Sequence, residues 1–160
     1  MMNIMHAMAS KGQPEPTFKA LAELVDKTIG VKLFTTLVID RERDVVRRNY
    51  SNMPEAYPIS GEKPRVKDRW ADIVEGQHQT FVLNSYEEIK ATFPDHELIR
   101  SLGCESCINI PVTINGQVIG TLNCLHDAGY YTQERIEAAN ALILPGAAAF
   151  LLHEKYGQGA

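Results

Sequence analysis

The sequence predicts an α+β fold built on an antiparallel sheet. Two β-rich runs, 105–114 and 117–126, flank Asn115-Gly116, the strongest short signal for a two-residue hairpin. Helical patterns stand at both ends of the chain, and a stretch rich in Pro and Gly separates the first strands from the last. Because terminal helices can cover one sheet face, we expect the middle segment to cover the other face, with a pocket beneath it.

Length and composition are those of one globular domain. The chain has 160 residues, of which 44% are hydrophobic and 22% charged, enough to build a core. The formal net charge is -4, and the basic residues form no cluster beyond the scattered Arg41, Arg43, Arg47 and Arg48. We therefore expect no nucleic-acid partner.

The amino-terminal stretch and the cysteines indicate the compartment. Residues 1–16 contain no continuous apolar run, so they match neither a signal peptide nor a membrane anchor. Three cysteines are too few, and odd in number, for a secreted disulfide framework. We expect a cytoplasmic protein with reduced thiols and no contact with a membrane.

The amino-terminal part predicts a helix followed by a hairpin. Thr17 is a candidate cap for a helix whose apolar residues recur at helical spacing until Gly30 stops it. The β-rich runs Leu33–Ile39 and Val45–Tyr50 flank a charged turn and predict two paired strands.

The middle of the chain predicts an irregular connection and short helices. Residues 52–65 hold three prolines and a glycine, so we expect a long loop that carries Tyr57 and Lys63. Such loops commonly hold binding residues. Asp68–Glu75 predicts a short helix with Trp70 turned inward.

Two more short helices are predicted before the central hairpin. They follow a brief strand, Thr80–Leu83. Ser85 with Glu88 forms a capping box for the first helix, and Asp95 is a candidate cap for the second, which Gly103 stops.

The last predicted helix sets the carboxyl-terminal limit of the domain. Thr132 can cap a helix that runs to about His153 and is kinked or split at Pro145-Gly146. We expect a flexible segment over residues 1–16, a single domain over 17–154 and a tail over 155–160.

The Asn-Gly turn also predicts a register for the central hairpin. If Ile114 pairs with Gln117, then Cys107 faces Cys124, and Glu105 faces His126. One face of this hairpin is then mainly aliphatic. The other face is chemically mixed and carries Cys107, Asn109, Leu122, Cys124 and His126.

From about Thr17 to His153 the chain resembles a GAF domain. The resemblance rests on Leu102-Gly103, on Cys107-Ile-Asn-Ile-Pro-Val112, on Gly116-Gln-Val-Ile-Gly-Thr-Leu-Asn123 and on the helix after Tyr131-Thr132. It implies a six-stranded antiparallel sheet, terminal helices on one face, and a small-molecule pocket under the middle insertion. The family is mostly sensory and regulatory and often dimerises through its terminal helices. This implies a homodimer and a possible signalling protein partner.

The expected pocket combines the mixed hairpin face with the loop and the insertion. Its candidate ligand-binding residues are Tyr57, Lys63, Trp70, Cys107, Asn109, Leu122, Cys124 and His126. We expect ligand to touch Asn109 and His126, with the insertion as its lid. In the alternative, these two side chains pair with the backbone of the insertion, and Trp70 and Phe93 fill the cavity.

His126 closes the last strand, as does a chromophore-contacting histidine in the similar phytochrome GAF domains. The chain lacks the rest of the phytochrome pattern, so no bilin is expected. It also lacks the Asn-Lys-Phe-Asp-Glu signature of cyclic-nucleotide GAF domains. No cofactor is predicted.

The thiols leave two other interpretations open. Cys104-x-x-Cys107 with Cys124-x-His126 offers zinc-ligand types, although not on the tight knuckles of zinc ribbons. Some GAF domains reduce free methionine-R-sulfoxide with cysteines, but no cysteine precedes Cys104 here. The favoured hypothesis is a non-catalytic sensory module for an unidentified small molecule. A thiol-dependent reductase and a dimerisation module without ligand are the alternatives.

Overall fold

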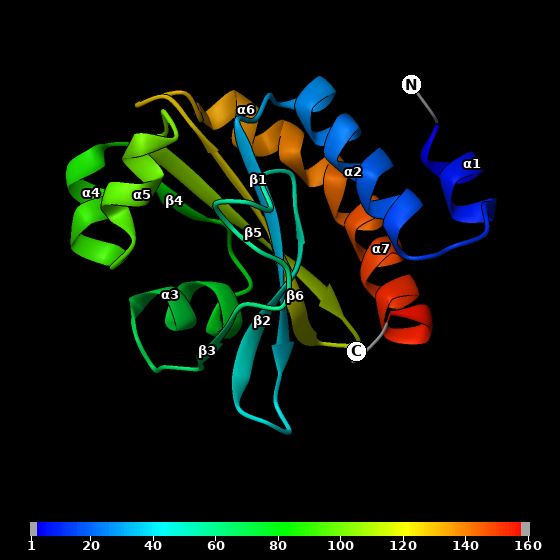
Figure 1. Cartoon of the computed structure of the whole chain (residues 1–160). Coiled ribbons are helices and arrows are strands. Elements are labelled where there is room, and N and C mark those ends of the chain that lie inside the picture. The colour runs from blue at the N-terminus through cyan, green and yellow to red at the C-terminus, as the bar shows by residue number, and fades with distance from the viewer. Residues whose placement is uncertain (1–2, 158–160) are drawn as a thin grey trace.

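A six-stranded sheet in the order β3-β2-β1-β6-β5-β4 forms the middle layer of the computed structural model, which describes residues 3–157 (Figure 1). The strands are β1 Leu33–Asp40, β2 Val45–Ser51, β3 Glu62–Pro64, β4 Phe81–Leu83, β5 Ser106–Ile114 and β6 Gln117–His126. Every neighbouring pair is antiparallel. The α+β, six-stranded prediction is therefore confirmed. Lys63, expected in a loop, instead lies on the edge strand β3.

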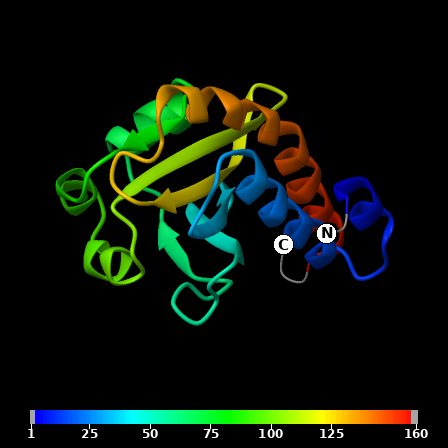
Figure 2. The ribbon, with the colours of Figure 1, turned by 90° about the horizontal axis from the view of Figure 1, so that it is seen from above.

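Helices from both ends of the chain cover one face of this sheet (Figures 1 and 2). They are α2 Glu15–Thr28, α6 Gln133–Ala138 and α7 Ile143–Tyr156. Their apolar side chains pack with those of the strands in a helix-side core that includes Phe18, Leu21, Phe34, Ile108, Leu122 and Phe150. Burial of this apolar area is the main force that holds the layers together.

The start of α2 differs from the predicted cap. The helix begins at Glu15, directly after Pro14, and Thr17 is fully buried within its first turn. Its hydroxyl donates to Gln13 Oε1 at 2.6 Å instead of capping a backbone amide. Pro16, at the second helical position and preset for helical φ, favours the start that Thr17 was expected to supply.

Both predicted terminal segments are partly helical. Within the stretch 1–16, expected to be a flexible segment, residues Ile4–Ala9 form α1, which is capped by Asn3 and buries Ala7. Helix α7 continues through Tyr156, which was assigned to the tail. Residues 1–2 and 158–160 lie outside the described part of the chain.

The carboxyl-terminal helix is split, but upstream of its proline. A 3₁₀ turn over Ala139–Leu142 separates α6 from α7. Pro145 then falls in the first turn of α7, where a missing backbone N–H breaks no helical hydrogen bond.

The insertion covers the other sheet face with short helices. These are α3 Arg69–Ala71, the π turn η1 Asp72–Gly76, α4 Tyr86–Thr92 and α5 His96–Ser101. They pack on an insertion-side core that includes Tyr57, Val74, Leu83, Ile89, Cys107 and Leu125. The predicted Ser85–Glu88 capping box is present.

The central hairpin has the predicted turn but not the predicted register. Asn115 and Gly116 both have positive φ, 51° and 75°, as a type I′ turn requires, and Ile114 pairs with Gln117. Between Val112 and Thr113 the pairing then shifts by one residue. This is a β-bulge on β6.

The bulge exchanges the faces of β6 relative to β5. Cys107 pairs with Leu125, not Cys124, and Ser106 pairs with His126. Leu122 and Cys124 therefore lie in the helix-side core, whereas Leu125 lies in the insertion-side core. The predicted membership of the mixed face is correct for β5 and wrong for β6. Gly120, a glycine inside a strand, is the sequence signal that could have indicated the bulge.

Candidate functional site

A cavity of about 420 Å³ lies between the insertion and the sheet. Five of the predicted ligand-binding residues line it, namely Tyr57, Lys63, Trp70, Cys107 and Asn109. Leu122, Cys124 and His126 do not, because the bulge and strand alternation direct them away from this side. Residues that the sequence analysis did not place in the pocket also line it, among them Thr35, Arg48, Asn123 and Leu125.

The floor of the cavity is a hydrogen-bonded network on the sheet. Trp70 Nε1 donates to Asn109 Oδ1 at 2.9 Å, and Asn109 Nδ2 donates to Asn123 Oδ1 at 2.7 Å. Asn123 Nδ2 reaches Thr35 Oγ1 at 3.2 Å. Asn109 thus pairs with the side chain of Trp70 in the insertion, and not with insertion backbone as the alternative hypothesis held. Trp70 and Phe93 line the cavity without filling it.

One wall of the cavity is made by Arg48, Tyr57 and Asp95, from three separate segments. The Tyr57 hydroxyl donates to Asp95 Oδ2 at 2.5 Å, and the Arg48 guanidinium carbon lies 4.8 Å from the centre of the Tyr57 ring. Burial, reinforced by the Asp95 carboxylate, raises the pKa of Tyr57, so the phenol stays a donor. Burial lowers the pKa of Arg48.

Asp95 does not play the capping role that its sequence position predicts. It occupies the N-cap position of α5, but its side chain accepts no hydrogen bond from that helix. Its carboxylate is turned toward Tyr57 instead. The usual preference of Asp for helix caps is outweighed here by the tertiary partner.

A second arginine of the cavity is already neutralised. Arg65 Nη2 lies 2.7 Å from Glu75 Oε2, and Arg65 Nη1 lies 3.1 Å from Asp44 Oδ1. Arg65 and Glu75 both line the cavity. This pair links the segment after β3 to the π turn of the insertion. It is a structural clamp at the edge of the cavity.

The three cysteines are buried, free, and unsuited to act as nucleophiles. Burial raises the pKa of Cys104 and of Cys124, and raises the pKa of Cys107 to about 12. A thiol that stays protonated at neutral pH is a poor nucleophile. Cys107 and Cys124 also lie on opposite faces of the sheet. Within residues 3–157, no group of three or more His, Cys, Asp or Glu side chains could hold a metal ion.

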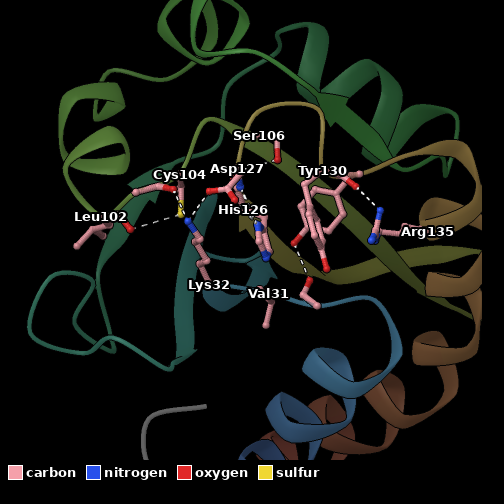
Figure 3. A network of polar contacts seen from close by, with 12 residues as sticks. Val31, Lys32, Leu102, Cys104, Ser106, His126, Asp127, Tyr130 and Arg135 are labelled. Atoms are coloured by element: carbon pink, nitrogen blue, oxygen red, sulfur yellow. Dashed lines mark hydrogen bonds and ion pairs between the residues drawn. The ribbon is translucent and has the colours of Figure 1, made fainter.

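His126 belongs to a separate network at the end of β6 (Figure 3). Its ring stacks on Tyr130, with centroids 3.5 Å apart, and its Nδ1 accepts the Asp127 backbone N–H at 2.8 Å. Asp127 forms an ion pair with Lys32, whose ammonium also donates to Gly103 O at 3.1 Å. The network joins the start of β1 to the turn after β6, and the Arg135 guanidinium covers Tyr130. His126 is thus a stacking and capping residue, not a wall of the cavity.

Comparisons with known proteins agree with this architecture. A family model described as GAF domain matches residues 14–150. The GAF domain of a two-component sensor histidine kinase from Bacillus halodurans aligns with a TM-score of 0.69 at 15% identity, covering 93% of this chain and 100% of that one. No curated protein matches the sequence.

Two further solved structures share the fold. The GAF domain of an Acinetobacter phosphoenolpyruvate-protein phosphotransferase aligns with a TM-score of 0.65 at 11% identity, over 98% of this chain and 93% of that one. Residues 122 to 287 of a methyl-accepting chemotaxis protein align with a TM-score of 0.66 at 14% identity, over 96% and 98%. At these identities the likeness concerns the fold alone.

Proposed function

The chain belongs to the GAF domain family, and from that premise we propose that it is a non-catalytic sensory module whose cavity under the insertion binds a small molecule. GAF domains are typically regulatory, and the similar structures come from a sensor kinase and a chemotaxis protein. In this proposal ligand occupancy changes how the insertion packs on the sheet. The change is passed to a signalling protein partner.

The observation that carries the proposal is the cavity itself. Its volume of about 420 Å³ falls within the range of small-molecule sites. Aliphatic side chains such as Leu33, Leu37 and Leu125 line it beside a few polar groups, which is the usual composition of such sites.

The cysteines support the non-catalytic part of the proposal. A thiol-dependent reductase needs an accessible thiol of low pKa, whereas all three thiols are buried with raised pKa values. Three free thiols also fit a reducing compartment, which supports a cytoplasmic location. The proposal includes no cofactor.

The test is a thermal-shift screen with a variant that closes the cavity. Val66 lines the cavity and is 61% exposed, so Val66→Trp places a large ring at its mouth without disturbing the core. Ile59→Trp is the matched control, because Ile59 is also exposed, at 52%, and lies outside the lining. A compound that binds the folded state raises Tm.

We expect hits that stabilise the native protein and Ile59→Trp equally and lose their effect on Val66→Trp. A diverse library without a single stabilising compound would contradict ligand binding. Equal stabilisation of both variants would place the ligand elsewhere.

A further inference from the structure

Some charged side chains of the cavity are already paired with another group of the protein, and others have hydrogen-bonding capacity to spare. Arg65 forms ion pairs with Glu75 and Asp44, and Asp68 accepts the backbone N–H of Ala71 at 2.9 Å. Lys63 is exposed on β3 and remains hydrated. The remaining pair is Arg48, which lies over the Tyr57 ring, and Asp95, which accepts from the Tyr57 hydroxyl.

Arg48 is held in place with most of its donors unused. Its Nη1 donates to Pro58 O at 3.0 Å, and an added Cβ on Gly61 would lie 2.8 Å from this nitrogen. Its Nε is buried, yet no acceptor among the described residues reaches it. No carboxylate within residues 3–157 lies within ion-pair distance of this guanidinium. A half-buried cation without an anionic partner is costly unless a ligand supplies one.

Asp95 is the complementary case. One of its carboxylate oxygens accepts from Tyr57, and its side chain makes no other hydrogen bond within the described residues. An ionised carboxylate can accept several donors. It therefore presents unused acceptor capacity in the cavity that Arg48 also lines, and its charge acts on the Arg48 guanidinium.

Charge complementarity decides what kind of ligand fits both groups. A simple acid bound at Arg48 would bring a second negative charge toward Asp95, and a simple amine at Asp95 would bring a second positive charge toward Arg48. A ligand with a carboxylate and an ammonium on one carbon pairs both. A guanidinium binds a carboxylate by two parallel hydrogen bonds. The aliphatic walls leave room for an apolar remainder.

We propose that the ligand is an α-amino acid with an apolar side chain, its carboxylate on Arg48, its ammonium on Asp95 and its side chain against the apolar walls. This inference rests on the proposed function and names the ligand class for the same cavity.

The experiment measures dissociation constants by titration calorimetry on the full chain, with three series of matched probes. The zwitterions are L-leucine, L-phenylalanine and L-tryptophan at up to millimolar concentration. The amides L-leucinamide, L-phenylalaninamide and L-tryptophanamide lack the carboxylate. The acids 4-methylpentanoate, 3-phenylpropanoate and indole-3-propanoate lack the ammonium. We expect at least one zwitterion to bind, and its amide and its acid each to bind about 10- to 100-fold more weakly, since one charged hydrogen-bonded contact is lost.

Two variants test whether the ligand carboxylate binds Arg48 and the ligand ammonium binds Asp95. Arg48→Gln should weaken the zwitterion and the acid by about tenfold or more. It should not weaken the amide, because it removes the positive charge that repels the ammonium. Asp95→Asn should weaken the zwitterion and the amide, while its amide oxygen still accepts from Tyr57. It should not weaken the acid, because it removes the negative charge that repels the carboxylate. Lys90→Gln and Glu97→Gln, exposed positions on α4 and α5 outside the lining, should change nothing.

Each other outcome overturns the inference. If no zwitterion binds while a neutral compound from the thermal-shift screen does, the ligand class is wrong and the proposed function stands. If a zwitterion binds but the two variants do not separate the probe series, the pairing with Arg48 and Asp95 is wrong. If neither probes nor library bind, both proposals fail together.

Discussion

The surroundings of His126 favour the neutral form of its ring. Burial lowers its pKa from the ordinary value of 6.5, and the positive charges of Lys32 and Arg135 lower it further, while Asp127 opposes them. The hydrogen bond from Asp127 N also requires an unprotonated Nδ1. The folded state therefore disfavours protonation of this ring.

The expected consequence is a loss of stability in acid. Because the pKa is lower in the folded state, stability is fully present above about pH 6.5 and falls as the unfolded chain begins to bind the proton below it. His126→Phe keeps the stacking on Tyr130 and cannot be protonated. We expect the loss of Tm from about pH 7.5 to pH 5.5 to be smaller in this variant.

Two other histidines complete this test. Burial also lowers the pKa of His153, so this residue should account for part of the loss of Tm that remains in His126→Phe. A variant that combines His126→Phe with His153→Phe should therefore lose still less Tm in acid. His6→Gln, at an exposed position on α1, is the control. An unchanged acid slope in His126→Phe would show that this histidine does not couple folding to pH.

At the scale of elements, the bulge in β6 decides which residues reach the cavity. Next to the bulge, Gly120 lies close to its neighbours: a Cβ there would lie 2.3 Å from Leu37 O and 2.8 Å from Phe150 Cζ. The first contact is with backbone, which cannot rotate away. The position therefore accepts glycine alone without a shift of β1 or α7.

We expect Gly120→Ala to lower the free energy of unfolding by about 2 kcal/mol or more, as overpacking against fixed backbone does. Gly76→Ala is the control, because its nearest neighbour would lie 3.8 Å away, and we expect a change within about 0.5 kcal/mol. Urea denaturation measures both. Equal stability of the two variants would mean that the sheet adapts at Gly120.

At the scale of the whole molecule, the outer side of α7 is apolar and uncovered in this single chain. Leu144 is 79% exposed and Leu151 is 49% exposed, and a spacing of seven residues places them on one helix face. Such a stripe is typical of an interface. We therefore predict a homodimer through the terminal helices.

Sedimentation velocity at roughly tens of micromolar, a range that detects weak association, tests the prediction. The native protein should sediment as a dimer, and Leu144→Glu with Leu151→Glu as a monomer. Ile59→Glu changes an exposed apolar residue of the loop after β2 and should leave the dimer intact. A native protein that stays monomeric would contradict the prediction.

The carboxyl-terminal helices are apolar enough to resemble a membrane-spanning segment. By length and composition alone, Gln133–Tyr156 could cross a membrane. In the fold this stretch is broken by a 3₁₀ turn and contributes Leu142, Ala149 and Phe150 to the helix-side core. Helices that pack on a sheet can have the same length and apolar composition as a membrane-spanning helix.

The sequence by itself determined the local features. Helix periodicity, the Ser85–Glu88 capping box and the Asn115-Gly116 turn depend on residues close together in the chain, and all three are present. The layout of terminal helices on one face and an insertion on the other followed from their order. Five members of the predicted pocket were identified from loop position and strand alternation.

Tertiary structure alone decided the features that depend on distant neighbours. The register of β6 shifts where Gly120 meets β1 and α7, and this one-residue slip moves Leu122 and Cys124 to the opposite face. Asp95 leaves its helix cap because Tyr57, 38 residues away, offers a donor. Local sequence patterns reflect interactions between residues that are close in the chain. The walls of a cavity are set by contacts between segments that meet only when the chain has folded.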